Sequence, residues 1–150
     1  MATIKSFTSL EQSRKLVKIL PLESADMCYQ YVLPKSDKIK HNPEIGNPVN
    51  ALKWYNKGYT ASGKGPITLD EYCVPCWSLA TLLNVLPVII GSVLSKNALR
   101  LRIDKSETDF NVWYDNIDRG MVEEGLDIIE SNPVDACVEM IIRLSKNELI

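Results

Sequence analysis

The sequence predicts an α+β fold, in which about three helices pack against a small, mainly antiparallel sheet. Apolar residues recur at helical spacing in three separate segments, and they alternate with polar residues in two segments between Leu99 and Tyr114. The composition, with 45% hydrophobic and 24% charged residues, is that of a globular protein. A length of 150 residues suits one domain, so we expect a single α+β domain over residues 1–150.

The first helix is expected over residues 8–20. Thr8 and Glu11 have the spacing of a capping box, in which each side chain accepts a hydrogen bond from the backbone near the other. Pro21 then ends the apolar helical pattern, because proline lacks the N–H that a continuing helix needs. A strand is expected next, between Met27 and Leu33.

Residues 34–66 are rich in proline and glycine, and we expect an irregular, loop-rich segment there. One short helical or extended piece is expected within it, from Val49 to Tyr55. A loop of about thirty residues is unusual in a compact domain and often has a function. The segment is therefore a candidate binding loop, although a surface insertion without a role fits the composition equally well.

The second helix is expected over residues 78–86, with Ser78 as its N-cap and Pro87 after its end. Two strands are then expected on either side of the polar stretch 105–108, because apolar and polar residues alternate there. These strands read as a hairpin.

The third helix is expected over residues 133–146. Asn132 is a good N-cap, Pro133 suits the first helical position, and Asp135 lies at the positive end of the helix dipole. Its predicted inner face consists of Val134, Cys137, Val138, Met140, Ile141 and Leu144.

Charge limits the classes of partner. The net charge is −2 and the isoelectric point is near 5.5, which lacks the basic footprint of a nucleic-acid binder, so no nucleic acid is expected. Residues 72–95 carry no charge and are long enough to span a bilayer, but Pro87 would break a helix near the middle of the span. We expect no membrane association, and with no export signal we expect a cytoplasmic location and reduced thiols.

Cys73 and Cys76 form the sharpest local motif, since two thiols three positions apart can form a disulfide or share a metal. At a helix N-terminus, the second thiol would have a lowered pKa and act as a thiolate. A zinc site would need further ligands from Cys28, Cys137 or His41, and a second closely spaced pair is absent. A plainer interpretation is two small apolar residues in a turn at the helix entry. No catalytic residue is singled out, and no cofactor or metal is expected.

Aromatic and basic residues are interleaved within the loop-rich segment. Trp54, Tyr55 and Tyr59 lie close to Lys53 and Lys57. Such a patch could stack single-stranded nucleic acid. In a chain that is acidic overall, a short surface patch or a protein-contact surface is the better interpretation, and aromatic residues are enriched in interface cores.

The chain also resembles a set of uncharacterised small proteins of gut Bacteroides-type bacteria, which are often encoded on phages and other mobile elements. The resemblance rests on residues 7–13, 21–27, 74–83 and 134–140, which include Pro75-Cys76-Trp77-Ser78. It implies a small intracellular accessory protein, and it brings no activity, cofactor or catalytic residue. A cysteine at the position of Cys73 is not part of the family pattern.

Two hypotheses follow. The first is a non-enzymatic protein-interaction or accessory protein from a phage or mobile element, which binds a partner protein or a second copy of itself through Trp54, Tyr55 and Tyr59. The alternative is a thiol redox or zinc-binding protein that uses Cys73 and Cys76.

Overall fold

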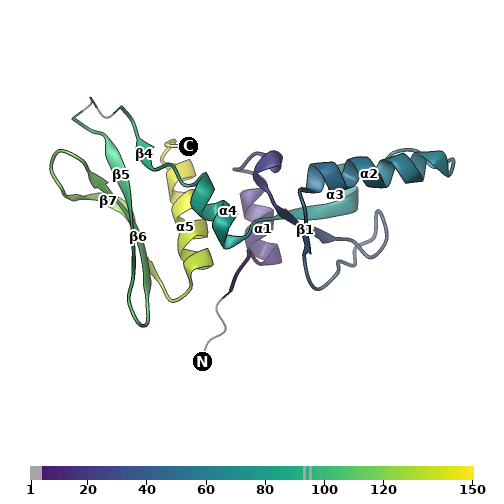
Figure 1. Ribbon diagram of the computed structural model, residues 1–150, viewed down its shortest axis with the longest axis horizontal. Helices are drawn as coiled ribbons and strands as arrows, with labels where there is room; N and C mark the ends of the chain where they lie inside the picture. Colours follow the sequence, from purple (N-terminus) through teal and green to yellow (C-terminus); the bar gives the residue numbers. More distant parts are fainter. Residues whose placement is uncertain (1–4, 93, 95) are drawn as a thin grey trace. The chain divides into compact units, whose positions relative to one another are not determined.

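The computed structural model describes residues 5–92, 94 and 96–150, and it confirms the α+β class. The described residues form five α-helices, one 3-10 helix and two antiparallel sheets (Figure 1). The chain divides into two compact units. The N-terminal unit is Phe7–Thr81, and the C-terminal unit is Leu82–Ile150 together with Lys5 and Ser6. The expectation of a single folding domain stays a prediction, because this division does not measure whether either unit folds alone.

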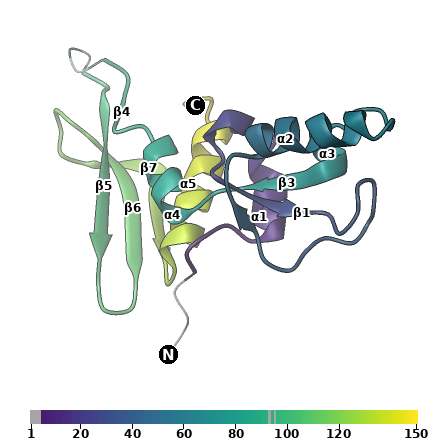
Figure 2. The same cartoon turned by 45° about the vertical axis from the view of Figure 1, so that its right-hand side comes forward.

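The N-terminal unit contains a three-stranded sheet in the order β2-β1-β3, with β1 in the centre. Helix α1 packs against β3, and α2 lies beside α3 and β3 (Figure 2). The elements are α1 (Leu10–Leu16), the 3-10 helix η1 (Leu22–Ser24), β1 (Met27–Gln30), β2 (Glu44–Ile45), α2 (Pro48–Ala61), α3 (Leu69–Tyr72) and β3 (Cys73–Cys76).

Helix α1 is shorter than the expected helix over 8–20, and its N-cap lies one residue later than predicted. Ser9, not Thr8, is the N-cap, and it forms a capping box with Gln12. The hydroxyl of Thr8 is buried and accepts a hydrogen bond from the Trp77 backbone N–H instead. The capping prediction therefore failed because Thr8 makes a long-range contact that no local pattern reveals.

The short helical or extended piece expected from Val49 to Tyr55 is part of a longer helix, so the segment 34–66 is less irregular than expected. Residues 48–61 form α2, a helix of 14 residues. Asn47 caps it by accepting hydrogen bonds from the backbone N–H groups of Val49 and Asn50, and Pro48 occupies the first turn. The same Asn-Pro pair at 132–133 predicted the last helix, so the signal for α2 was present in the sequence.

The segment Cys73–Cys76 is a strand, which corrects the expected turn at a helix entry. Strand β3 pairs with β1 on one side only, from Gln30 opposite Cys73 to Met27 opposite Cys76. The next helix, α4 (Leu79–Val85), begins after the strand and contains the division between the two units. Ser78 accepts a hydrogen bond from the Thr81 N–H, as an N-cap does.

The C-terminal unit contains a four-stranded sheet in the order β4-β5-β6-β7. The predicted hairpin is present, and Ser106 and Asp109 close its loop with two hydrogen bonds. Strand β7, which is rich in acidic residues, was not predicted. The elements are β4 (Ile89–Ile90), β5 (Leu99–Lys105), β6 (Phe110–Asn116), β7 (Val122–Glu130) and α5 (Pro133–Lys146).

Helix α5 has the predicted bounds and the predicted cap, with Asn132 accepting a hydrogen bond from the Val134 N–H. It lies along one face of the sheet (Figure 1), and its inner residues meet the inward side chains of β6 and β7. All six residues predicted for its inner face are buried. The core of this unit is therefore an apolar helix face on an apolar sheet face.

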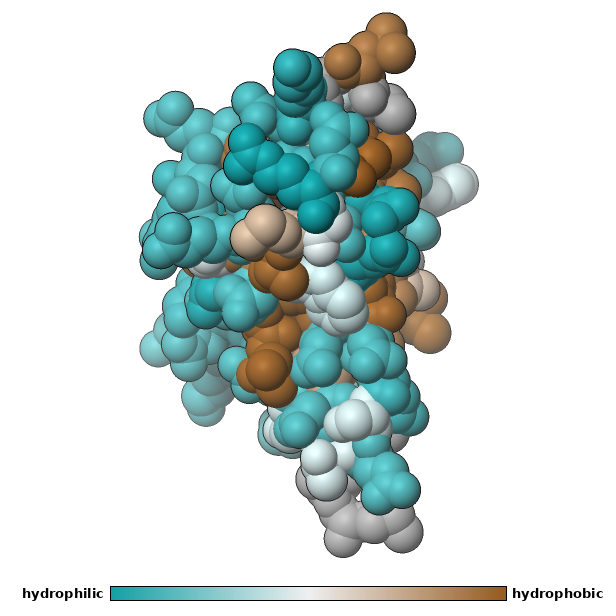
Figure 3. Space-filling view, turned by 90° about the vertical axis from the view of Figure 1, so that its left-hand side faces the viewer, coloured by the Kyte–Doolittle hydropathy of each residue, from teal (hydrophilic) through white to brown (hydrophobic). Residues whose placement is uncertain are grey.

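The other face of the four-stranded sheet is mainly hydrophilic, with apolar side chains visible between the polar ones (Figure 3). Asp115 lies there between Arg100 and Arg102, at 3.5 and 3.1 Å from their Nε atoms. At the edge strand β7, the Arg143 guanidinium of α5 donates hydrogen bonds to the carbonyl oxygens of Gly125 and Asp127, both at 3.1 Å.

Within the described part of the chain, no helix combines the length and the apolar character needed to cross a membrane. The uncharged run 72–95 instead contributes to β3, α4 and β4 where its residues are described.

Candidate functional site

The N-terminal unit carries a surface rich in aromatic and basic residues on α2, which we call the α2 surface. This surface consists of Lys53, Trp54 and Lys57 on the helix, all exposed, together with the partly buried Tyr59 and with Lys64 in the loop that follows the helix. The Trp54 side chain is 74% exposed, although it stands near the middle of a well-capped helix. A helix therefore presents this tryptophan to solvent, within a segment that the sequence predicted to be mostly irregular.

Lysines lie over the aromatic rings of the α2 surface. The Lys57 Nζ lies 5.3 Å from the centroid of the Trp54 ring, and the Lys64 Nζ lies 5.5 Å from that of Tyr59. These are cation–π distances. The sequence from Ile45 to Leu69 contains three lysines and no acidic residue, so no carboxylate from this stretch neutralises them.

Tyr55, which was grouped with Trp54 in the sequence, has a different role. Its ring stacks on Tyr59, with centroids 5.5 Å apart, and meets Tyr72 of α3 at 5.0 Å. Tyr55 is only partly exposed, and it joins α2 to the helix that leads into β3. The three predicted contact residues therefore divide into an exposed one, Trp54, and a packing pair, Tyr55 and Tyr59.

The end of α2 is fixed by one side chain. The Asn56 amide donates to the Ile67 carbonyl and accepts from the Ile67 N–H, both at 2.9 Å. This reproduces the hydrogen bonds of a strand pair and closes the loop that follows α2.

The structure does not bring Cys73 and Cys76 together. Their side chains point to opposite faces of β3, because they are an odd number of residues apart in a strand. Three residues of extended chain separate their Cα atoms by about 10 Å, whereas a disulfide needs less than about 7 Å. All four cysteines are free and buried, so the redox pair of the alternative hypothesis is absent from this geometry.

Cys76 belongs to a buried polar network centred on Thr8. The Thr8 Oγ1 lies 2.7 Å from the Ser13 Oγ and donates to the Cys76 Sγ at 3.4 Å. The Tyr29 hydroxyl donates to the Thr8 carbonyl at 2.8 Å. Burial raises the pKa of Cys76, partly offset by these hydrogen bonds, which is opposite to the lowered pKa expected at a helix N-terminus. Burial also raises the pKa of Tyr29, to about 12.

Cys73 lies on the other face of the small sheet from Cys76, and its neighbour there is Cys28. The two thiols lie close together across β1 and β3. Their interaction lowers the pKa of Cys28, whereas the same interaction together with burial raises the pKa of Cys73. Neither thiol is open to solvent, since each is 2% exposed.

The remaining candidate zinc ligands lie on other elements of the chain. Cys137 is buried in α5 of the C-terminal unit, where burial raises its pKa to about 12. His41 is an exposed residue between β1 and β2. Among the residues that the structure describes, no group of three or more His, Cys, Asp or Glu side chains could hold a metal ion.

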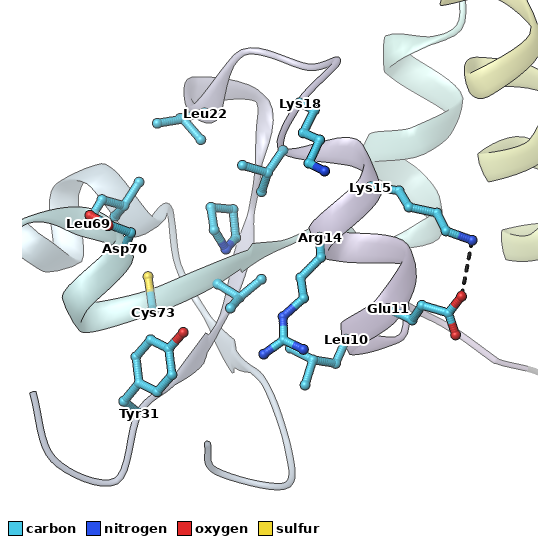
Figure 4. A pocket seen from close by; sticks show the side chains of 13 residues that line it. Leu10, Glu11, Arg14, Lys15, Lys18, Leu22, Tyr31, Leu69, Asp70 and Cys73 are labelled. Carbon is cyan, nitrogen blue, oxygen red and sulfur yellow. Dashed lines mark ion pairs between the residues drawn. The ribbon is translucent and has the colours of Figure 1, made fainter. Parts of the chain in front are cut away.

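The N-terminal unit also contains a pocket of about 900 Å³, between α1, η1, α3 and the free edge of β3 (Figure 4). Its size is within the range of small-molecule sites, roughly 300–1,000 Å³. Six apolar residues form most of its wall. They are Leu10, Val17, Leu22, Leu69, Val74 and Pro75.

Five charged residues line the same pocket. Lys15 turns away toward Glu11 and pairs with it at 3.1 Å, as Figure 4 shows. Asp70 accepts a hydrogen bond from the Thr68 hydroxyl at 2.6 Å. Arg14 and Lys18 make no ion pair with any residue that the structure describes. The charge available to a ligand is therefore positive.

Sequence reasoning did not find this pocket. Its walls come from α1 and from residues 69–75, which are about sixty positions apart, and Arg14 and Lys18 look like ordinary exposed helix residues. One feature of the sequence could have indicated the pocket: the three basic residues Arg14, Lys15 and Lys18 lie within five positions and have a single acidic residue, Glu11, close by. Comparison with family models, curated proteins and solved structures gave no match to this chain.

Proposed function

We propose that this protein is a non-enzymatic interaction module that binds an acidic segment of a partner protein through the α2 surface. One observation carries the proposal: Trp54 is 74% exposed on a helix whose surrounding sequence, from Ile45 to Leu69, contains three lysines and no acidic residue. The resemblance to uncharacterised small proteins of gut Bacteroides-type bacteria and their mobile elements, which implies a small intracellular accessory protein, supports a role of this kind.

An exposed tryptophan has a large potential gain on binding. Burying an aromatic side chain removes about 150–250 Å² from water, and tryptophan is among the residues most often found to dominate interface energies. The nearby lysines add attraction for carboxylates, which speeds association and selects acidic partners. The partner segment expected here therefore combines acidic residues with an apolar side chain that covers Trp54.

Single-stranded nucleic acid is the competing ligand, because bases stack on aromatic rings and phosphates attract lysines. The protein partner is favoured because it needs only a few carboxylates beside an apolar side chain, whereas a nucleic acid brings a continuous row of phosphates to a chain whose net charge is −2. A test must therefore include both ligands.

The experiment compares affinity capture from a lysate of Bacteroides-type cells by the wild-type protein and by Trp54→Ala and Lys57→Glu variants. We expect both variants to lose most of a specific partner, by about tenfold or more, since a hot-spot tryptophan contributes about 2 kcal/mol or more. The melting temperature of Trp54→Ala should stay close to that of the wild type, because exposed substitutions change stability by about 0.5 kcal/mol or less.

Ile129→Ala is the matched control, because Ile129 is a large apolar residue that is 66% exposed in the C-terminal unit. It should retain the partner. Equal recovery by the wild type and Trp54→Ala would contradict the proposal. Binding of a labelled single-stranded oligonucleotide that Trp54→Ala abolishes would replace it with the nucleic-acid alternative, and concentration-dependent dimerisation that Trp54→Ala abolishes would replace it with self-association.

A further inference from the structure

The pocket beside α1 has the chemistry of a ligand site of its own, which does not involve Trp54. We propose that it binds a small amphiphilic carboxylate, whose apolar body lies against the wall of the pocket and whose carboxylate pairs with Arg14 and Lys18.

The wall of the pocket favours an apolar body. Aliphatic side chains of α1, α3 and β3 face it, and Leu22 of η1 closes one end (Figure 4). Displacing water from such a surface stabilises a bound apolar group by about 25 cal/mol per Å² of area buried. A compact polar ion alone, such as phosphate, would leave this surface uncovered.

The charges of the pocket favour a single anionic group. The lining carries three basic and two acidic side chains, and of the two acids Glu11 is paired with Lys15 whereas Asp70 accepts a hydrogen bond from the Thr68 hydroxyl, so the lining keeps a net positive charge. Arg14, in the last turn of α1, and Lys18, in the turn that follows the helix, are exposed and make no ion pair in the described structure. Arginine can bind a carboxylate through two parallel hydrogen bonds.

The free edge of β3 argues against an added peptide strand as the occupant. The Tyr31 N–H donates to the Tyr72 carbonyl, and antiparallel pairs alternate, so the backbone groups of Cys73 and Pro75 point away from β1. Pro75 has no N–H, and the Cys73 N–H is bonded to the Leu69 carbonyl. A peptide would find no donor for its own carbonyl groups at this edge, whereas a small amphiphile needs none.

The test is a calorimetric titration of the full chain with decanoate below its micelle concentration, with decanol and inorganic phosphate as two further arms. We expect decanoate to bind with one-to-one stoichiometry. Decanol should bind about tenfold more weakly because it lacks the carboxylate, and phosphate should give no heat because it lacks the apolar chain. The Arg14→Gln/Lys18→Gln variant should bind decanoate about tenfold more weakly and decanol unchanged.

Arg119→Gln is the matched control, since Arg119 is an exposed arginine of the C-terminal unit, and it should bind decanoate as the wild type does. Absence of decanoate binding, equal affinity for decanoate and decanol, or an equal effect of the pocket and control variants would each overturn the proposal. Because both pocket residues are exposed, unchanged circular dichroism is expected and separates lost binding from lost folding.

Discussion

The two units of this protein are stabilised in different ways. The C-terminal unit has an apolar core, in which the fully buried face of α5 covers one face of a regular antiparallel sheet. The N-terminal unit has short strands, and polar side chains lie at its centre, where Thr8 contacts Ser13, Cys76 and the Trp77 backbone. The stability of the C-terminal unit therefore depends on close packing and buried apolar area, whereas that of the N-terminal unit also depends on buried hydrogen bonds that must all be satisfied.

The largest expected effect is in the apolar core. Met140→Ala removes a side chain that is fully buried in α5, and we expect it to lower the free energy of unfolding by about 2–5 kcal/mol through lost burial and a residual cavity. Urea denaturation followed by circular dichroism measures the change. The exposed control Ile129→Ala should cost about 0.5 kcal/mol or less. Similar losses for both variants would show that α5 does not cover a packed core.

A smaller effect is expected in the polar centre. Thr8→Val keeps the shape of the side chain but removes the hydroxyl that bonds Cys76 and the Trp77 N–H. Leaving these buried groups without a partner should cost about 1–3 kcal/mol in urea denaturation. Thr8→Ser keeps the hydroxyl and should recover much of this loss. If valine were tolerated as well as serine, the hydrogen bonds of the centre would contribute nothing to stability.

The smallest predicted effect is on alkaline stability. Burial raises the pKa of Tyr29 from 10 to about 12 because it disfavours the charged phenolate. The folded state therefore keeps the phenol neutral, and its stabilising contribution is complete below pH 10 and is lost as the pH rises toward 12. At pH 11 the loss amounts to about 1.4 kcal/mol.

The measurement for this prediction is the change in unfolding free energy between pH 9 and pH 11. The Tyr29→Phe variant lacks the titrating group and should show a smaller change, by about 1 kcal/mol, than the wild type. The variant also loses the hydrogen bond to the Thr8 carbonyl at every pH, so only the slope with pH is compared. Parallel slopes would mean that the Tyr29 phenol ionises as freely in the folded protein as in the unfolded chain.

The same difference explains what sequence reasoning achieved. Helix α5 and the hairpin of β5 and β6 were predicted with nearly correct bounds, because their apolar residues follow the period of the element that they form. Thr8 and Cys76 were misplaced because their positions depend on each other across 68 residues. No local pattern records a hydrogen bond between distant side chains.

The candidate sites divide in the same way. Trp54 was predicted to be a contact residue from composition alone, and the structure adds only that it is exposed on a helix. The pocket was missed because its cations lie on α1 and in the turn after it, whereas part of its wall lies on β3. Composition and spacing do not show that the fold brings these distant segments together. The cysteine motif misled because its spacing suits a helix entry, whereas the residues form a strand that begins after the short helix α3.

The side chain of Arg143 affects whether two copies of this protein can pair through their edge strands. Strand β7 lies at an edge of its sheet, and an edge strand ordinarily offers free carbonyl oxygens to a strand of another molecule. The Arg143 guanidinium occupies the carbonyls of Gly125 and Asp127, and acidic side chains crowd the rest of the strand. A β7 strand of a second molecule would meet carbonyl oxygens that are already hydrogen bonded and side chains of the same negative charge. Helix α5, which packs in the core, therefore also disfavours intermolecular β-pairing at this edge.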